Sequence, residues 1–372
     1  MGKRDKEISA VVEKRGVPKI DIREFDIPQT GDDDGLLRVT MVGVCSTDAK
    51  NFFGSPTRPE SVYPLIMGHE ITGVIERVGH NAAARWGVKE GDRVIVVPTT
   101  GCGRCFLCAS GRSRYCKQPE AIGYGYKTSC RIPPHLWGGY GQYMYLHPNA
   151  IVFPFYTDLP DEAAVLVCAA VGNAVNWVRT AGQVALGDAV VIQGPGPQGL
   201  CAAAVAKDCG ASPVIVTGLS RDRDRLNTAK KFGADYTIDI EKEDVLSRVR
   251  DITGGSMADL VVDVSGSPSG VPVSVDLVRP LGTVICGTLS GGKKAEIVTD
   301  KLALSEIRYQ GVFSHTARAA LTALRLAETR KYPFEKMVTH QLPLVEAERA
   351  LALAYGKVEG EAPIKVVLLP WQ

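Results

Sequence analysis

The sequence predicts an α/β protein with a parallel sheet covered by helices on both faces, beside a β-rich region of irregular structure. Two observations predict this class. From about residue 159 onward, short β-branched runs alternate with helical patterns, which is typical of a parallel sheet buried on both faces. Before about residue 150, strand-like runs are short and separated by Gly and Pro, which favours an irregular β-rich fold. Because a domain typically holds about 100–200 residues, a chain of 372 residues is expected to form two.

The individual elements follow from these patterns. In the first region, strands are expected at residues 36–44 and 93–97. In the second region, short apolar runs are read as strands and the stretches between them as helices: strands 189–193, 214–217, 236–240, 260–264, 283–287 and 308–312, and helices 200–209, 225–232 and 245–252. A helix at 318–329 and a final strand at 364–369 are expected after residue 315.

Composition excludes several classes of protein. The chain is 45% apolar and 23% charged, with a net charge of +2, as in an ordinary globular protein. A dedicated nucleic-acid binder would show a stronger basic excess. No apolar run is expected to reach the roughly 18 residues of a membrane span, and the charged residues 1–7 do not resemble a secretory signal. We therefore expect a cytoplasmic protein with no nucleic-acid or membrane partner.

Four cysteines lie close together in the first region and form the pattern C-x2-C-x2-C-x7-C: Cys102, Cys105, Cys108 and Cys116. Four thiolates suit tetrahedral zinc, and a site closed by four protein ligands is structural. An iron–sulfur cluster is the alternative, but the long last gap and the lack of other redox features favour zinc. A nucleic-acid-binding zinc ribbon is a weaker alternative, because the loop carries only three arginines and lies inside a larger domain.

A second candidate metal site combines Cys45, His69 and Glu70. One thiolate, one imidazole and one carboxylate form a mixed set, as expected of a catalytic zinc that keeps a coordination position open. Taken singly, Cys45 is equally consistent with a core residue, His69 with a hydrogen-bonded turn residue and Glu70 with a surface charge.

A dinucleotide-binding turn is expected after the strand at 189–193. A G-x-G-x-x-G sequence follows that strand and opens a helix; its relevant residues are Gly194, Gly196, Pro197, Gln198 and Gly199. Such glycines let backbone N–H groups approach a pyrophosphate, whose charge the helix N-terminus favours. The sequence therefore predicts a doubly wound, Rossmann-type sheet that binds NAD or NADP.

The end of the second strand bears on the choice between the two coenzymes. NAD enzymes usually carry Asp or Glu there to bind the ribose 2′-OH, but this position is Gly218. Ser220, Arg221 or Arg223 could bind a 2′-phosphate, although nearby aspartates blur the charge argument. The sequence therefore favours NADP slightly.

Three further positions lie at the carboxyl ends of predicted strands, where ligands gather in open parallel sheets. These are Ser265, Gly287 and Phe313. We expect them to lie near the nicotinamide.

Several motifs together resemble those of zinc-containing medium-chain dehydrogenases/reductases. These are the string G-H-E-x-x-G-x5-G from Gly68, the Cys-x-Thr-Asp element at Cys45, the four-cysteine loop and the dinucleotide turn. Residues 171–175 (V-G-N-A-V) make the chain more similar to the threonine and polyol dehydrogenase branch. The resemblance covers essentially the whole chain. It implies a GroES-like catalytic domain, residues 1–158 completed by 316–372, and a Rossmann domain at 159–315.

The resemblance also implies roles for single residues. Cys45 and His69 would ligate catalytic zinc, with Glu70 as a direct or exchangeable ligand. Thr47 would accept the proton of the substrate hydroxyl, and Asp48 would orient His69. The resemblance further implies two zinc ions per chain, one catalytic and one structural, and a homodimer or homotetramer.

The sequence departs from the family pattern at two positions. Where related enzymes often carry a further zinc ligand, this chain has Ala169, preceded by Cys168. Either Cys168 reaches the metal or the site relies on the other three residues and water. Lys50 replaces a histidine often found after the relay hydroxyl, and could pass protons, contact a coenzyme phosphate or face solvent.

These inferences predict a zinc-dependent alcohol dehydrogenase that interconverts an alcohol, either a secondary alcohol or a polyol, and its carbonyl compound with NAD(P). A zinc-free enoyl or quinone reductase on the same fold is the alternative enzyme, but such proteins commonly lack both metal sites. A structural or nucleic-acid-associated protein would leave Cys45, His69 and the dinucleotide turn unexplained. Phe52, Phe53 and Trp137 are candidates for lining the substrate pocket, although aromatic residues more often belong to a core.

Overall fold

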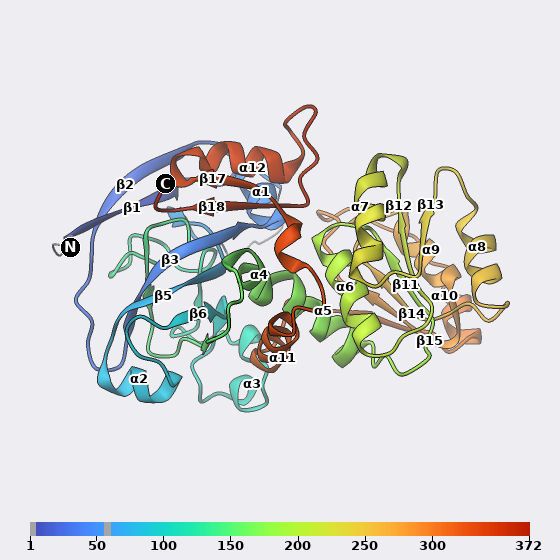
Figure 1. The fold of residues 1–372 in the computed structure, drawn as a ribbon, viewed down its shortest axis with the longest axis horizontal. Coiled ribbons are helices and arrows are strands. Elements are labelled where there is room, and N and C mark those ends of the chain that lie inside the picture. Colours follow the sequence, from blue (N-terminus) through green and yellow to red (C-terminus); the bar gives the residue numbers. More distant parts are fainter. Residues whose placement is uncertain (1–4, 56–60) are drawn as a thin grey trace. The chain divides into compact units, whose positions relative to one another are not determined.

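The computed structural model describes residues 5–55 and 61–372. The chain forms two compact units (Figure 1). The first comprises the residues up to Ala169 together with Thr316–Arg330 and Phe334–Gln372. The second comprises Ala170–His315 and Lys331–Pro333. The first change of unit thus falls at Ala169, where the sequence analysis expects it after residue 158.

The first unit is organised around a seven-stranded sheet. Its strand order is β10-β6-β5-β3-β18-β17, with β9 paired to β3. The strands are β3 (Gly35–Val44), β5 (Glu70–Val78), β6 (Arg93–Val96), β9 (Tyr143–Leu146), β10 (Val152–Pro154), β17 (Val338–Pro343) and β18 (Lys365–Leu369). The last strand lies antiparallel to β3, with Val366 opposite Val44. The C-terminal segment therefore completes the N-terminal unit (Figure 1).

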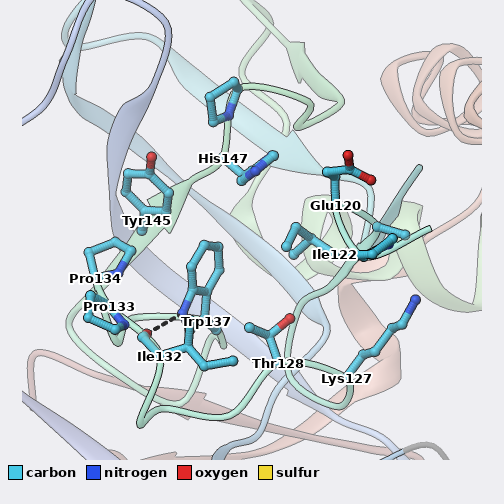
Figure 2. Close-up of a pocket in the computed structure, with 13 residues that line it drawn as sticks. Glu120, Ile122, Lys127, Thr128, Ile132, Pro133, Pro134, Trp137, Tyr145 and His147 are labelled. Atoms are coloured by element: carbon cyan, nitrogen blue, oxygen red, sulfur yellow. Dashed lines mark hydrogen bonds between the residues drawn. The ribbon is translucent and has the colours of Figure 1, made fainter. Parts of the chain in front are cut away.

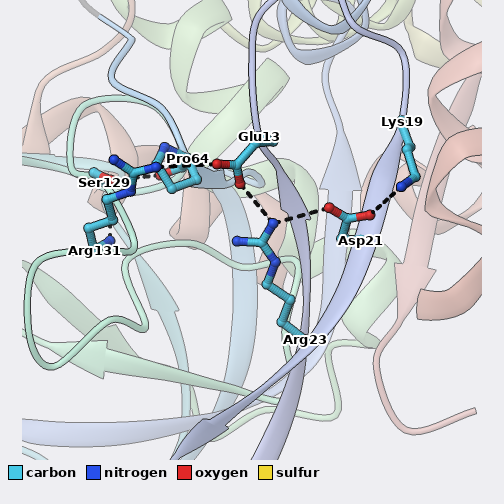
Figure 3. Close-up of polar contacts among 7 residues, drawn as sticks. All are labelled: Glu13, Lys19, Asp21, Arg23, Pro64, Ser129 and Arg131. Atoms are coloured by element: carbon cyan, nitrogen blue, oxygen red, sulfur yellow. Dashed lines mark hydrogen bonds and ion pairs between the residues drawn. The ribbon is translucent and has the colours of Figure 1, made fainter.

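Two smaller sheets flank the main one: β2-β1-β4 and β7-β8. Their strands are β1 (Lys6–Val12), β2 (Ile20–Asp26), β4 (Leu65–Ile66), β7 (Thr99–Thr100) and β8 (Ile122–Gly123). A chain of ion pairs joins the β1–β2 hairpin to a loop: Arg23 contacts Asp21 at 3.1 Å and Glu13 at 2.7 Å, and Glu13 contacts Arg131 at 3.3 Å (Figure 3). These side chains are largely exposed, so we expect the pairs to contribute little stability.

Helices surround the sheets of the first unit. They are α1 (Ser46–Phe52), α2 (His80–Trp86), α3 (Phe106–Ala109), η1 (Ser113–Tyr115), α4 (Asp161–Leu166), α11 (Ala317–Glu328), η6 (Phe334–Met337), η7 (Leu344–Glu346) and α12 (Ala347–Tyr355). The core beneath them is apolar and includes Leu36, Val42, Phe52, Ile71 and Leu351, each no more than 1% exposed. This packing fixes the ends of β3 and β5.

The second unit contains a six-stranded parallel sheet with the order β13-β12-β11-β14-β15-β16. Its strands are β11 (Val190–Gln193), β12 (Val214–Gly218), β13 (Tyr236–Asp239), β14 (Ala258–Asp263), β15 (Val278–Cys286) and β16 (Arg308–Gly311). The strand order reverses between β11 and β14, which is where ligands bind in such sheets. The doubly wound parallel sheet expected from the sequence is confirmed.

Helices of the second unit connect these strands. They are α6 (Pro197–Asp208), η4 (Ser220–Asp222), α7 (Arg223–Ala229), η5 (Lys230–Phe232), α8 (Val245–Ile252), α9 (Gly270–Leu277) and α10 (Thr299–Leu304). Helix α6 packs on β11 and β12, and α9 packs on β14 and β15. The loops that leave the carboxyl ends of the strands thereby form one edge of the sheet.

One helical stretch is long and apolar enough to span a membrane by length and composition alone. It runs from Asp161 to Ala181 and is 21 residues long. It comprises α4, η2 (Val167–Val171), α5 (Gly172–Ala174) and η3 (Val175–Ala181). Within its most apolar window, 83% is buried inside the protein, as in a core helix that is apolar on all sides.

Candidate functional site

Three potential metal ligands meet at the ends of β3 and β5. Cys45 follows the last residue of β3, His69 precedes β5 and Glu70 begins it. Because Gly43 pairs with Glu70 in this antiparallel ladder, the two chain segments lie side by side. One ligand atom from each of Cys45, His69 and Glu70 lies within 4.8 Å of the others. The residues that the sequence predicts as ligands are therefore brought together.

Asp48 arranges this group from the first turn of α1. Its carboxylate lies 3.1 Å from Nδ1 of His69 and accepts hydrogen bonds from the Cys45 backbone N–H at 3.3 Å and the Tyr140 hydroxyl at 3.5 Å. Asp48 is only 2% exposed. A carboxylate on one imidazole nitrogen sets the tautomer and directs the other nitrogen to a metal.

The charges of the group influence one another strongly. Burial lowers the pKa of His69, but Asp48 and Cys45 together outweigh this effect and raise the pKa to about 10. Burial raises the pKa of the Cys45 thiol, whereas His69 lowers it, and the net shift is downward. Zinc binding at this site would require His69 to be neutral and Cys45 to be a thiolate, so it would release protons. The close approach of one thiol, one imidazole and one carboxylate is the arrangement that zinc uses. The donor set therefore fits zinc.

Lys365 is a member of this site that the sequence analysis missed. It begins β18, is 6% exposed, forms an ion pair with Glu70 and donates to the Val44 carbonyl at 3.1 Å. Burial lowers the pKa of Lys365, but the negative charges of Glu70 and Cys45 raise it by more than burial lowers it. The net shift of the pKa is therefore upward. The only sequence signal was a lysine at the start of an apolar strand.

Thr47 and Lys50 lie on α1 beside the ligands. The Thr47 hydroxyl donates to Sγ of Cys45 at 3.1 Å. Lys50 is half-buried and three residues further along the helix, a spacing that places two side chains on the same face.

Cys168 is not among the grouped ligands. In the part of the chain that the structure describes, the group at this site contains Cys45, His69 and Glu70 alone. Cys168 is 1% exposed and lies at a break in the helical stretch, next to Ala169 with φ −138° and ψ −109°. Burial raises the pKa of its thiol well above the usual range. These observations favour a core residue rather than a ligand.

The four-cysteine loop forms a second group between β7 and β8. Its ligand atoms all lie within 4.8 Å of one another. Sγ–Sγ distances of 3.6 Å (Cys105–Cys108), 3.8 Å (Cys105–Cys116) and 4.0 Å (Cys102–Cys108) are close to the edge of about 3.8 Å that a tetrahedron with Zn–S bonds of about 2.3 Å would have. The loop therefore fits a closed zinc site.

The dinucleotide turn joins β11 to α6 as expected. Gly194 has φ +105°, and Gly196 immediately precedes α6, with Pro197 as its first residue. A Cβ atom on Gly199 would lie 1.9 Å from the Gly194 carbonyl oxygen, so only glycine permits this close packing. No acidic residue occupies the first turn of α6, which leaves its N-terminus suitable for an anion.

Acidic side chains border the segment after β12. Gly218 is the last residue of that strand and pairs with Asp239 of β13. The Ser220 hydroxyl donates to Asp239 at 2.8 Å, and the Ser220 backbone N–H donates to Glu241 at 2.7 Å. Arg221 is exposed. The segment therefore offers both a guanidinium and two carboxylates.

The remaining predicted coenzyme residues lie at the carboxyl edge of the same sheet. Ser265 follows β14, Gly287 follows β15 and Phe313 follows β16. Asp263, which the sequence analysis missed, accepts hydrogen bonds from the Ser265 backbone N–H at 3.0 Å and hydroxyl at 2.7 Å. Its carboxylate therefore holds the loop after β14.

The aromatic residues suggested for the substrate pocket have different surroundings in the structure. Phe52 belongs to the core, and Phe53 packs against the Tyr355 ring at 4.8 Å. Trp137 lines a pocket of about 520 Å³ together with Tyr145 and His147, and donates to the Ile132 carbonyl at 2.7 Å (Figure 2). None of the grouped metal ligands lines this pocket.

Comparison with known proteins places the chain in a family. Residues 31–161 match the model of the alcohol dehydrogenase GroES-like domain, and residues 197–329 match that of the zinc-binding dehydrogenases. A "probable alcohol dehydrogenase" of Mycobacterium tuberculosis is 38% identical over 94% of this chain and 95% of its own length. Erythritol/L-threitol dehydrogenase of Mycolicibacterium smegmatis is 31% identical over 94% of each chain.

A solved structure supports the same assignment. The alcohol dehydrogenase of Thermotoga maritima superposes with a TM-score of 0.88 at 26% identity, over 98% of this chain and 99% of its own. The resemblance inferred from the motifs is confirmed. This chain is a member of the zinc-containing medium-chain dehydrogenase family, an oxidoreductase that acts on alcohols with zinc and NAD(P) as cofactors.

Proposed function

We propose that the enzyme interconverts a secondary alcohol or polyol and its carbonyl compound at a catalytic zinc held by Cys45 and His69, with Glu70 as a direct or exchangeable ligand. The observation that carries this proposal is the meeting of one thiolate, one imidazole and one carboxylate within 4.8 Å. A second, structural zinc is proposed in the four-cysteine loop. Both donor sets argue against a zinc-free reductase.

When bound, zinc supplies Lewis-acid chemistry at the substrate oxygen, and NAD(P) exchanges the hydride. The protein's own residues supply position and proton transfer. The Asp48 carboxylate, 3.1 Å from Nδ1 of His69, would orient the imidazole so that Nε2 remains available as a ligand. The Thr47 hydroxyl, 3.1 Å from Sγ of Cys45, would accept the proton of the substrate hydroxyl. Lys50, on the same face of α1, is proposed as the next group toward solvent.

Lys365 limits how Glu70 takes part. One oxygen of the Glu70 carboxylate is held by the Lys365 ammonium group. The other oxygen would be available to the metal. We propose that this ion pair makes Glu70 an exchangeable ligand, because a carboxylate shared with an ammonium group is a weaker donor.

For the coenzyme, we propose a slight preference for NADP. Gly218 places no carboxylate beside a 2′-phosphate, and the exposed Arg221 could pair with one. The Asp239 and Glu241 carboxylates at Ser220 oppose an added negative charge, so the preference should be small. We expect kcat/KM for NADP to exceed that for NAD by less than about tenfold, and Asp239→Asn to increase the ratio.

The enzyme is proposed to act as a cytoplasmic homodimer or homotetramer. The described residues include all ten cysteines, and none of these forms a disulfide, as expected in a reducing compartment. Strand β16 lies at an edge of the parallel sheet, and exposed edges are commonly covered. Leu281 and Leu304 near this edge are 67% and 88% exposed. Light scattering coupled to gel filtration would test whether a second copy covers them.

A substrate panel tests the proposed reaction. The zinc-loaded enzyme is assayed with primary alcohols, secondary alcohols, polyols and aromatic alcohols, each with NAD and NADP. We expect turnover of secondary alcohols or polyols with both coenzymes. Activity confined to reduction of enoyl or quinone substrates, and unchanged after removal of zinc, would overturn the proposal.

A further inference from the structure

A short helical segment of the second unit bonds to the chain that leaves β16. Asn176 donates through Nδ2 to the Ser314 carbonyl at 2.9 Å, and Trp177 donates through Nε1 to the same oxygen at 3.2 Å. Asn176 is 5% exposed and Trp177 is 3% exposed. Both carbonyl lone pairs of Ser314 are therefore used by side chains of one helix.

Ser314, which accepts both hydrogen bonds, has an unusual backbone conformation. Ser314 has φ +53°, a left-handed conformation that is uncommon for residues other than glycine. It lies between Phe313, which the sequence predicts as a coenzyme contact, and His315. The two hydrogen bonds thus determine the direction of the chain at a predicted ligand position.

The same helical segment also reaches the dinucleotide turn. Oδ1 of Asn173 lies 3.0 Å from Nδ1 of His315, and Nδ2 of Asn173 donates to Oε1 of Gln198 at 3.4 Å. Gln198 is the second residue of α6. Asn173 therefore connects the chain after β16 to the turn expected to hold the pyrophosphate.

The residue after β15, Gly287, is a third predicted coenzyme contact, and it packs against Trp177 of the helical segment. A Cβ atom on Gly287 would lie 2.9 Å from two ring atoms of Trp177, so the indole packs directly on the backbone after β15. Residues 173–177 thus touch the turn at Gln198, the residue after β15 and the chain after β16.

The helical geometry is itself unusual at this place. Element η3 (Val175–Ala181) is a π-helix, and the Gly182 N–H donates to the Trp177 carbonyl at 2.7 Å. Helices with this i→i+5 bonding are rare and occur frequently at functional sites.

The strand order indicates which half of the coenzyme these segments serve. In a doubly wound sheet each half binds one mononucleotide, and the adenosine ribose lies at the end of the second strand, here β12. The segments after β15 and β16 belong to the other half of the sheet, across the reversal between β11 and β14. They would therefore face the nicotinamide mononucleotide.

We propose that Asn176, Trp177 and Asn173 are positioning residues for the nicotinamide half of the coenzyme, an inference that rests on the proposed use of NAD(P). They act through Ser314, Gly287 and Gln198. If these three residues only stabilised the second unit, their substitution would weaken binding of both halves of the coenzyme equally.

Binding measurements on the full-length, zinc-loaded enzyme separate these roles. Asn176→Leu keeps the side-chain volume and removes the donor, and Trp177→Phe keeps ring packing and removes Nε1–H. Dissociation constants are measured for the preferred reduced coenzyme and for its nicotinamide-free analogue, ADP-ribose or its 2′-phosphate. We expect each variant to bind the reduced coenzyme about fivefold to tenfold more weakly and to bind the analogue as the unmodified enzyme does.

A matched control lies on the same helix. Among the described residues, the Thr180 hydroxyl bonds within its own helix, to the Val175 carbonyl at 3.4 Å, so Thr180→Ala should change neither constant. Equal losses for both ligands, or no loss for either, in both variants would overturn the inference while leaving the proposed function intact. An unmodified enzyme that binds neither ligand would instead overturn the proposed function, and the inference with it.

Discussion

The ammonium group of Lys365 and the carboxylate of Glu70 form a buried ion pair beside the proposed zinc ligands. The pair joins residues 295 positions apart in the chain. Sequence patterns identify Glu70, because its neighbours form a recognisable string, but they contain no information about a partner so distant. The same limit explains why Asp263 was missed, since its importance depends on the loop that it bonds.

Removing one member of this pair should be costly. Lys365→Met leaves Glu70 buried without its counter-charge, and we expect a loss of about 3–5 kcal/mol in the free energy of unfolding. Urea denaturation of the protein freed of catalytic zinc measures it, because zinc would otherwise supply a counter-charge to Glu70, with Lys365→Arg as the control that retains the charge. The double change Lys365→Met/Glu70→Gln should recover part of the loss. Equal stability of Lys365→Met and the unmodified enzyme would contradict the role assigned to the pair.

Glu7 provides a test based on pH. Burial raises its pKa from 4.5 to about 7, although Ser9 and two backbone N–H groups bond to its carboxylate. Because the folded-state pKa is raised, its contribution to stability is fully present below about pH 4.5 and is lost as the pH rises through about 7.

Glu7→Gln should therefore reduce the fall in stability between pH 5 and 7, by at most about 3 kcal/mol. The free energy of unfolding is measured at several pH values, with the exposed Glu24→Gln as the control. An unchanged pH profile in Glu7→Gln would show that Glu7 does not titrate in this range.

At the scale of elements, the central strands of the second unit, β11, β12 and β14, were predictable because each is a short, buried, apolar run bounded by turn residues. The predicted helix at residues 245–252 coincides with α8, and the predicted strand at 308–312 exceeds β16 by one residue. The stretch from Asp161 to Ala181 was not predicted. It is apolar on all sides, so it lacks the periodicity by which a helix is recognised.

The dinucleotide turn allows a prediction about one element. Gly199→Ala places Cβ 1.9 Å from the Gly194 carbonyl oxygen, whereas a Cβ on Gly196 meets nothing within 4 Å. We expect Gly199→Ala to lower the free energy of unfolding by about 1–3 kcal/mol, because α6 must move away from β11. Thermal unfolding in the absence of coenzyme measures this effect.

Gly196→Ala is the matched control for that experiment. It should leave the unfolding temperature of the coenzyme-free protein unchanged, yet weaken coenzyme binding if the pyrophosphate approaches this backbone. A similar loss of stability in both variants would contradict the packing described for the turn.

At the scale of the whole molecule, the local spacing of residues identifies the two groups of candidate zinc ligands in the first unit and the dinucleotide turn in the second. The placement of β18 beside β3 is different, because it pairs residues more than 300 positions apart. Local patterns cannot determine such a pairing, and only the resemblance to a known family indicated that the C-terminal segment completes the first unit.

The central claim is that one zinc is catalytic and held by Cys45, while a second is structural. The direct test is the zinc content of the purified protein and of Cys45→Ala, measured by elemental analysis alongside circular dichroism and turnover. We predict two zinc ions per chain in the unmodified protein and one in Cys45→Ala, with the fold intact and turnover lost. An unmodified chain with one zinc or none, or a Cys45→Ala variant with two zinc ions and full turnover, would contradict the account.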